Sequence, residues 1–195
     1  MANFTAIFDA NVLYPVPLRD LLLWLATTGM FRARWTNEIH EEWIRSLLAN
    51  RPDLNRDQLE RTRRLMDAHA DECLIEGYEV LIETLELPDP DDRHVLAAAI
   101  AGRVDVIVTM NLKDFPADVL GPFGIEAQHP DEFIGHLIDL SPARVCEAIR
   151  ACHQNLKNPP KTVDEYLDTL LRQELPHAVA AIRIHCFGEA LWPMA

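Results

Sequence analysis

The sequence lacks the features that mark membrane and secreted proteins. No run approaches the eighteen or more consecutive apolar residues of a membrane-spanning helix, and the first five residues show neither the basic start nor the apolar stretch of a signal peptide. Internal repeats and low-complexity tracts are also missing. The chain is therefore expected to be cytoplasmic and without membrane contact.

Cysteine and histidine are present, but not in metal-binding patterns. The four cysteines show no short paired spacing of the kind that zinc sites use, and a chain of 195 residues that is 49% hydrophobic needs no disulfide framework. We expect four buried thiols, at Cys73, Cys146, Cys152 and Cys186. The eight histidines form no HExxH or similar spacing, so none is assigned to chemistry.

Positive charge is scarce overall and concentrated in one segment. The formal net charge of −13 excludes a protein that coats nucleic acid by electrostatics alone, because phosphate binding needs cationic surface. Residues 32–64 differ, with eight arginines and six acids. This segment is either a pair of solvated helices laced with ion pairs or a flank that faces RNA.

Apolar runs and helical stripes alternate along the first two thirds of the chain. Strands are expected at 4–8, 31–35 and 104–109, with another candidate at 125–127. Helices are expected at the positions that follow: 18–25, after Thr36, after Asn55 or Asp57, 93–101 and 130–140. The short apolar segments 73–75 and 80–82 are ambiguous. The alternation predicts a three-layer α/β/α domain with a mainly parallel central sheet.

The character of the chain changes after residue 140. Helical stretches are predicted at 142–156, 163–175 and 176–187, separated by prolines. We therefore divide the chain into an α/β domain, 1–140, and a helical C-terminal extension, 141–195.

Polar residues follow two of the apolar runs directly. Asp9 and Asn11 come after the first strand, and Thr109, Asn111 and Asp114 come after the strand at 104–109. Ligands of an open parallel sheet bind beyond the carboxyl ends of its strands. These two stretches are therefore candidates for a functional site.

A third acidic group, Asp89, Asp91 and Asp92, stands before the helix at 93–101, where a helix N-terminus stabilises carboxylates. The alternating fold would bring Asp9, Asp92 and Asp114 to the same edge of the sheet. Carboxylates that converge there repel one another unless a divalent cation compensates, and oxygen ligands suit Mg²⁺ or Mn²⁺.

These motifs together resemble the PIN domain and, within it, the VapC toxins. Four stretches carry the resemblance, in the family's order and spacing: Phe8 to Asn11, Thr36 to Trp43, Pro88 to Ala99 and Thr109 to Phe115. The resemblance covers about residues 4–135. The tail 141–195 departs from the minimal VapC pattern and resembles an extension of some larger members; substrate selection, dimerisation and antitoxin capture all fit it.

The resemblance implies a metal-dependent endoribonuclease that is the toxin of a type II toxin–antitoxin pair. The acidic cluster that would hold one or two Mg²⁺ or Mn²⁺ ions is Asp9, Glu42, Asp92 and Asp114. The residues that would orient ligands or water are Asn11, Thr109 and Asn111. The resemblance further implies an RNA substrate, a cognate antitoxin that blocks the site, and a homodimer through the early helices.

Two choices between neighbouring acids stay open. Glu41 and Glu42 are adjacent on a helix and cannot face the same way, and Glu42 matches the motif better. Asp92 precedes by three residues the apolar face that begins at Val95, so we prefer it as a ligand and expect Asp91 to support the site as the helix cap.

Two other functions compete with the nuclease. A haloacid-dehalogenase-type phosphatase also places an Asp after its first strand and uses Mg²⁺, but it wants a second Asp where Asn11 stands. A catalytically inert PIN-fold binding module is the other alternative, because a fold does not imply a function.

Overall fold

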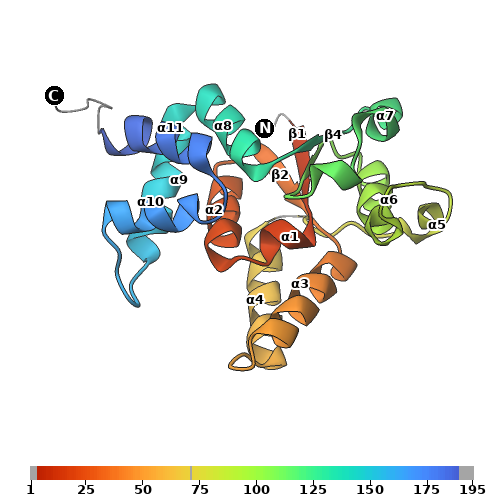
Figure 1. Ribbon diagram of the computed structural model, residues 1–195, viewed down its shortest axis with the longest axis horizontal. Coiled ribbons are helices and arrows are strands. Elements are labelled where there is room, and N and C mark those ends of the chain that lie inside the picture. The colour runs from red at the N-terminus through yellow and green to blue at the C-terminus, as the bar shows by residue number, and fades with distance from the viewer. Residues whose placement is uncertain (1–3, 71, 189–195) are drawn as a thin grey trace.

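The computed structural model describes residues 4–70 and 72–188. At its centre lies a parallel four-stranded sheet in the order β2-β1-β3-β4 (Figure 1). Its strands are β1 (Phe4–Phe8), β2 (Phe31–Arg34), β3 (Val106–Val108) and β4 (Glu126–Gln128). The predicted α/β fold with a parallel sheet and a helical C-terminal region is confirmed.

Helices flank the sheet and connect its strands (Figure 1). Before β3 these are α1 (Ala10–Leu13), α2 (Val16–Ala26), α3 (Asn37–Asn50), α4 (Arg56–His69), α5 (Glu79–Ile82), the 3-10 helix η1 (Pro90–Asp92) and α6 (Arg93–Ala101). After β3 they are η2 (Leu112–Asp114), α7 (Ala117–Leu120), η3 (Gly121–Phe123), α8 (Pro130–Leu140), α9 (Pro142–Asn155), α10 (Val163–Leu171) and α11 (Pro176–Phe187).

The central strand β1 is buried on both faces. Ala6, Ile7 and Phe8 are each 0% exposed, which explains why this strand is a continuous apolar run instead of an alternating one. On one face, the ring of Phe8 lies 6.2 Å from that of Phe133 on α8, and Phe31 lies 5.1 Å from the same ring. Helix α8 therefore covers this face of the sheet with an aromatic contact.

Local capping chemistry sets the starts of α3 and α4. The side chain of Thr36 accepts a hydrogen bond from the backbone of Ile39 at 3.0 Å. Asn55, and not Asp57, caps α4, where it forms a reciprocal capping box with Gln58.

Several expected boundaries shift in the structure. The strand predicted at 104–109 is shorter and spans Val106–Val108. The backbone N–H of Val104 donates to the carbonyl oxygen of Ala99 at the end of α6, and Asp105 hydrogen-bonds with Thr5 outside the regular pairing of β1 and β3. The helix predicted at 163–175 ends at Leu171. The ambiguous segment around Leu74 forms a parallel bridge with Trp35, and the one at 80–82 is helical as part of α5.

The C-terminal helices are docked on the rest of the chain. Helix α9 packs against α2, and α11 packs against α8 and α9, so the buried residues form one continuous core. Asp131 of α8 accepts hydrogen bonds from the backbone of His177 and Ala178 at 3.2 and 2.7 Å, which caps the first turn of α11. Within the described ranges, no helix combines the length and apolar character that a bilayer span requires.

The expectation of four free thiols is wrong for two of them. Cys146 on α9 and Cys186 on α11 form a disulfide, because the packing of these two helices brings their Cα atoms to 4.7 Å. Cys73 and Cys152 are free and buried, as expected. The sequence separation of 40 hid the pair from any argument based on spacing.

Candidate active site

Acidic side chains gather at the carboxyl ends of β1 and β3. Asp9 directly follows β1, and its backbone N–H donates to Val108 of β3 at 3.1 Å, so the sheet itself places it. Asp114 ends the short helix η2 after β3, and Asp92 stands where η1 passes into α6. Glu42 reaches the same edge from the middle of α3.

Three of these acids form a compact group. Among the residues that the structure describes, carboxylate oxygens of Asp89, Asp92 and Asp114 lie within 4.8 Å of one another. Two oxygens bound to one Mg²⁺ at about 2.1 Å lie at most about 4.2 Å apart, so a small closure would let all three share one ion. The donor set, made only of carboxylate oxygens, fits Mg²⁺ or Mn²⁺.

Asp9 and Glu42 belong to a neighbouring cleft of about 350 Å³ that also includes Asp92. Its lining residues are Asp9, Ala10, Asn11, Tyr14, Glu42, Trp43, Ser46 and Asp92. Asp92 is therefore common to the cleft and to the three-acid group. Asp9 does not fall within that compact group, so Asp92 connects Asp9 on one side with Asp114 on the other.

A hydrogen-bond network holds Asp9 in one orientation. Thr109 and Asn11 both donate to the same oxygen of Asp9, Oδ2, at 2.7 and 2.6 Å. The Thr109 hydroxyl accepts from Asn11 and from the backbone of Asn111, at 2.9 and 3.0 Å, so its own proton is directed to Asp9. Asn111 also bonds Asp114 through its side chain. The three polar residues expected to support the site thus link the ends of β1 and β3.

Burial and mutual repulsion raise the pKa values of two acids in the site. Burial is the main cause of the raised pKa of Asp9, which is only 4% exposed. The hydrogen bond from Thr109 lowers this pKa, and the negative charge of Glu42 raises it further. Burial, followed by the charges of Asp9, Asp89, Asp114 and Glu42, raises the pKa of Asp92 to about 7. Without a cation, the cluster therefore holds a proton near neutral pH.

His94 restrains Glu42. Its Nε2 lies 3.2 Å from a carboxylate oxygen of Glu42, while its Nδ1 lies 3.7 Å from Glu38. Burial alone would lower the pKa of His94, but the hydrogen bond and charge of Glu42, with the charges of Glu38 and Asp9, raise it above the ordinary value. No sequence spacing pointed to this histidine, because its partner is 52 residues away.

The neighbouring acid Glu41 faces away from the cleft. Its carboxylate pairs with Arg56 at 2.5 Å and with Arg63 at 3.3 Å, both on α4. Because successive helix residues point about 100° apart, the α4 contact leaves Glu42 on the side of Asp9. These pairs also show that part of the arginine-rich segment 32–64 forms ion pairs between and within helices.

The expectation that Asp91 caps the helix is wrong. Asp91 is exposed and its side chain caps no helix; instead, the side chain of Asp89 accepts a hydrogen bond from the backbone of Asp91 at 2.9 Å. Asp89 was noted in the sequence but not assigned as a ligand. Its spacing from Asp92 is the signal, since side chains three apart on a 3-10 helix eclipse each other.

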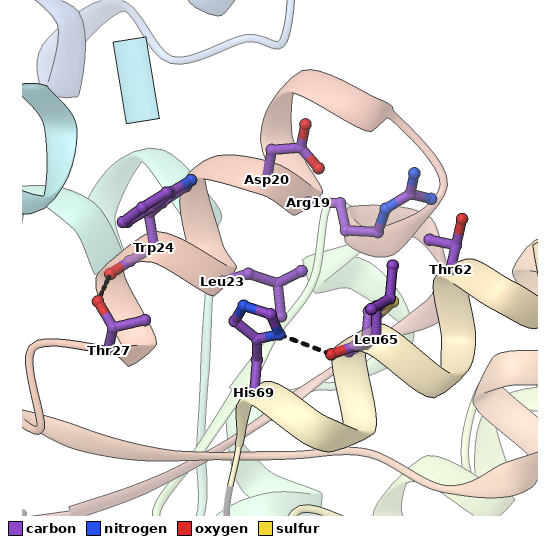
Figure 2. Close-up of a pocket in the computed structure, with 9 residues that line it drawn as sticks. Arg19, Asp20, Leu23, Trp24, Thr27, Thr62, Leu65 and His69 are labelled. Carbon is purple, nitrogen blue, oxygen red and sulfur yellow. Dashed lines mark hydrogen bonds between the residues drawn. The ribbon is translucent and has the colours of Figure 1, made fainter. Parts of the chain in front are cut away.

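A second hollow, of about 380 Å³, lies between α2 and α4 (Figure 2). It is mostly apolar and is lined by Leu23 and Trp24 of α2 and by Leu65 of α4, which is 52% exposed. Arg19 on its wall is buried, donates to the backbone oxygen of Leu13 at 3.0 Å and covers the ring of Trp43. This groove has no group of converging acids and is not the site described above.

Comparison with known families agrees with this geometry. The PIN domain family matches residues 5–113, which is more than half of the chain. The chain belongs to the PIN-domain family. A second family, described as the VapC50 C-terminal domain, matches residues 130–184 of this PIN protein, from α8 into α11.

A curated relative of this PIN protein has a similar sequence. The chain is 43% identical over 112 residues to "Putative ribonuclease VapC50" of Mycobacterium tuberculosis (strain ATCC 25618 / H37Rv). The match covers 57% of this chain and 66% of that protein, slightly under two thirds of its length. No solved structure matches this chain significantly.

Proposed function

We propose that this chain is a metal-dependent endoribonuclease of the VapC type, which cleaves RNA phosphodiester bonds as the toxin of a toxin–antitoxin pair. The observation that carries the proposal is the convergence of Asp9, Glu42, Asp92 and Asp114, joined by Asp89, at one edge of a PIN-family sheet. The mycobacterial relative is named as a ribonuclease, which supports activity on RNA.

In this proposal the acids hold one or two Mg²⁺ or Mn²⁺ ions. Asp89, Asp92 and Asp114 provide one compact set of oxygens, and Asp9 and Glu42 provide oxygens on the other side of Asp92. A bound divalent cation would supply Lewis acidity, activating water and stabilising the leaving oxygen. Thr109 and Asn11 keep the Asp9 carboxylate in place, and His94 keeps Glu42 in place.

The arginine-rich segment contributes a cation beside the cleft. Arg34, Arg51, Arg56 and Arg63 are engaged in ion pairs. Arg45 is exposed, has no ion-pair partner in the part of the chain that the structure describes, and stands one helical turn after Glu42. We assign it to contact with a substrate phosphate, which an otherwise acidic cleft needs.

The antitoxin, the homodimer and the domain division are also part of the proposal. A partner chain is supported by the exposed apolar groove between α2 and α4, since such patches are typical of interaction sites (Figure 2). We propose that residues 1–140 form the nuclease unit, because Phe133 of α8 completes the core of the sheet, and that 141–195 form the appendage.

The decisive experiment is cleavage of RNA by the purified protein. With Mn²⁺ or Mg²⁺ we expect a single-stranded oligoribonucleotide to be cut internally, and removal of the metal with a chelator to stop cleavage until the metal is restored. An aryl phosphate substrate in parallel tests the phosphatase alternative. Hydrolysis of the aryl phosphate without RNA cleavage would refute the nuclease, and absence of Mn²⁺ binding by calorimetry would favour an inert module.

The two adjacent glutamates on α3 provide a matched pair of variants. Glu42→Gln should reduce metal affinity or cleavage by about 10- to 100-fold, the loss typical of metal-site residues, whether Glu42 binds metal directly or through water. Glu41→Gln removes the same charge one residue away and should leave cleavage unchanged, since Glu41 faces Arg56 and Arg63. Equal loss in both variants would contradict the assigned orientation.

A further inference from the structure

The acidic cleft has one wall that metal chemistry does not explain. Its carboxylates come from Asp9, Glu42 and Asp92, but Tyr14 and Trp43 also line it. Trp43 is fully buried; its indole N–H donates to His40 at 3.0 Å and Arg19 covers its ring. Tyr14, in contrast, is partly exposed.

Packing against the core occupies only part of the Tyr14 side chain. Tyr14 follows the last turn of α1 and is half-buried, and its ring stacks on no other aromatic ring of the described chain. Within residues 4–70 and 72–188, its hydroxyl has no hydrogen-bond partner. The packing of this turn is provided by Val12 and Leu13, which are both 0% exposed. Tyr14 therefore packs against the core with part of its surface and leaves the rest at the cleft that it lines.

The position of Tyr14 relative to the acids is set by a short, rigid connection. The four residues of α1 (Ala10–Leu13) separate Asp9 from Tyr14, so the five steps between the two residues give a helical rise of about 7.5 Å. Helix α3 packs against α1 and closes the opposite wall with Glu42 and Ser46. In the proposed function the acidic residues act at the scissile phosphate. The ring of Tyr14, in the same cleft, is then close enough to contact the base of an adjacent nucleotide.

We infer that Tyr14 is a stacking platform for one unpaired nucleobase next to the scissile phosphate of the proposed RNA substrate. This deepens the proposed function, on which it rests for the choice of RNA as ligand. Bases in a duplex have both faces covered by their neighbours, whereas unpaired bases splay out onto aromatic side chains. Stacking tolerates any base, so Tyr14 selects for an exposed base and not for a sequence.

The test measures RNA binding separately from cleavage. In the Asp9→Asn background, fluorescence anisotropy with a labelled single-stranded ten-nucleotide oligoribonucleotide compares Tyr14 with Tyr14→Phe and Tyr14→Leu. We expect Phe to bind as the parent does and Leu to bind about 5- to 100-fold more weakly. A series of oligonucleotides, each with one abasic position, locates the stacked base. For the protein with Tyr14, the abasic site should weaken binding at one position in the series. For Tyr14→Leu, which already lacks the ring, the abasic site at that position should weaken binding no further.

Each outcome separates this inference from the nuclease proposal. Equal binding by Tyr14→Leu and the parent, or a loss in Tyr14→Phe as large as in Tyr14→Leu, overturns the stacking role even if the wild type cuts RNA. Tighter binding of the annealed duplex than of the single strand overturns the proposed contact with an unpaired base. Tyr14-dependent binding without any cleavage by the wild type supports the inference and refutes the nuclease. An unchanged melting temperature for the Leu variant excludes unfolding as the cause.

Discussion

Replacing Asp9 by Asn should reduce RNA cleavage by at least about 100-fold, with little change in the fold. Removing one electrostatic group that acts on the transition state typically costs about 10²–10³-fold, and Asp9 is the most buried acid of the cleft. An asparagine oxygen still accepts the hydrogen bonds from Thr109 and Asn11, so the ends of β1 and β3 stay connected. Single-turnover cleavage in Mn²⁺, together with circular dichroism, measures both effects.

Asp105→Asn provides the matched control. Asp105 precedes β3 at the opposite edge of the same sheet, where its exposed carboxylate accepts a hydrogen bond from the backbone of Thr5. The same change of charge there should leave cleavage at the parent rate. If Asp9→Asn cuts RNA as fast as the parent, the assignment of the site is wrong.

Asp92→Asn should change thermal stability in opposite directions without and with metal. Without metal, the variant should melt higher, because it removes a carboxylate that is repelled by Asp9, Asp89 and Asp114. At a Mn²⁺ concentration 100 times the parent's dissociation constant, the free energy of unfolding of the parent should rise by about 2.7 kcal/mol, and its melting temperature by roughly 5–10 °C. The variant should gain little stability from the metal. Thermal unfolding by circular dichroism measures both.

The pH dependence follows from the raised pKa of Asp92. Between the ordinary value of 3.8 and about 7, the folded protein binds a proton that the unfolded chain has released. The stability of the metal-free protein therefore falls as the pH rises through this window, and Asp92→Asn should flatten that slope. Mn²⁺ binding should release protons near pH 6 in the parent and fewer in the variant.

Asp91→Asn is the control for both measurements. Asp91 is exposed, and its charge is not among the causes that raise the pKa of Asp92. This variant should keep the metal response and the pH slope of the parent. A loss of Mn²⁺ stabilisation in Asp91→Asn equal to that in Asp92→Asn would contradict the assignment of Asp92.

Much of the site could be predicted because local rules connect acids to strand ends. The apolar run at 4–8 ends at Asp9, and a parallel sheet collects its ligands at that edge, so Asp9 and Asp114 could be placed near each other before any coordinates were known. The predicted capping residue was wrong where the 3-10 helix η1 replaced the expected first turn of α6. There Asp89, three residues before Asp92, took both the capping role and a position in the acidic group.

The amino-acid sequence by itself determined the alternation of strands and helices, the parallel sheet and the identity of most acids at its edge, because periodicity and strand ends are properties of short segments. Only the tertiary structure decided which of Glu41 and Glu42 faces the cleft, that His94 restrains Glu42, and that Cys146 meets Cys186. The physical reason is that these outcomes depend on how whole helices pack against each other, and side chains far apart in the chain meet only after that packing is complete.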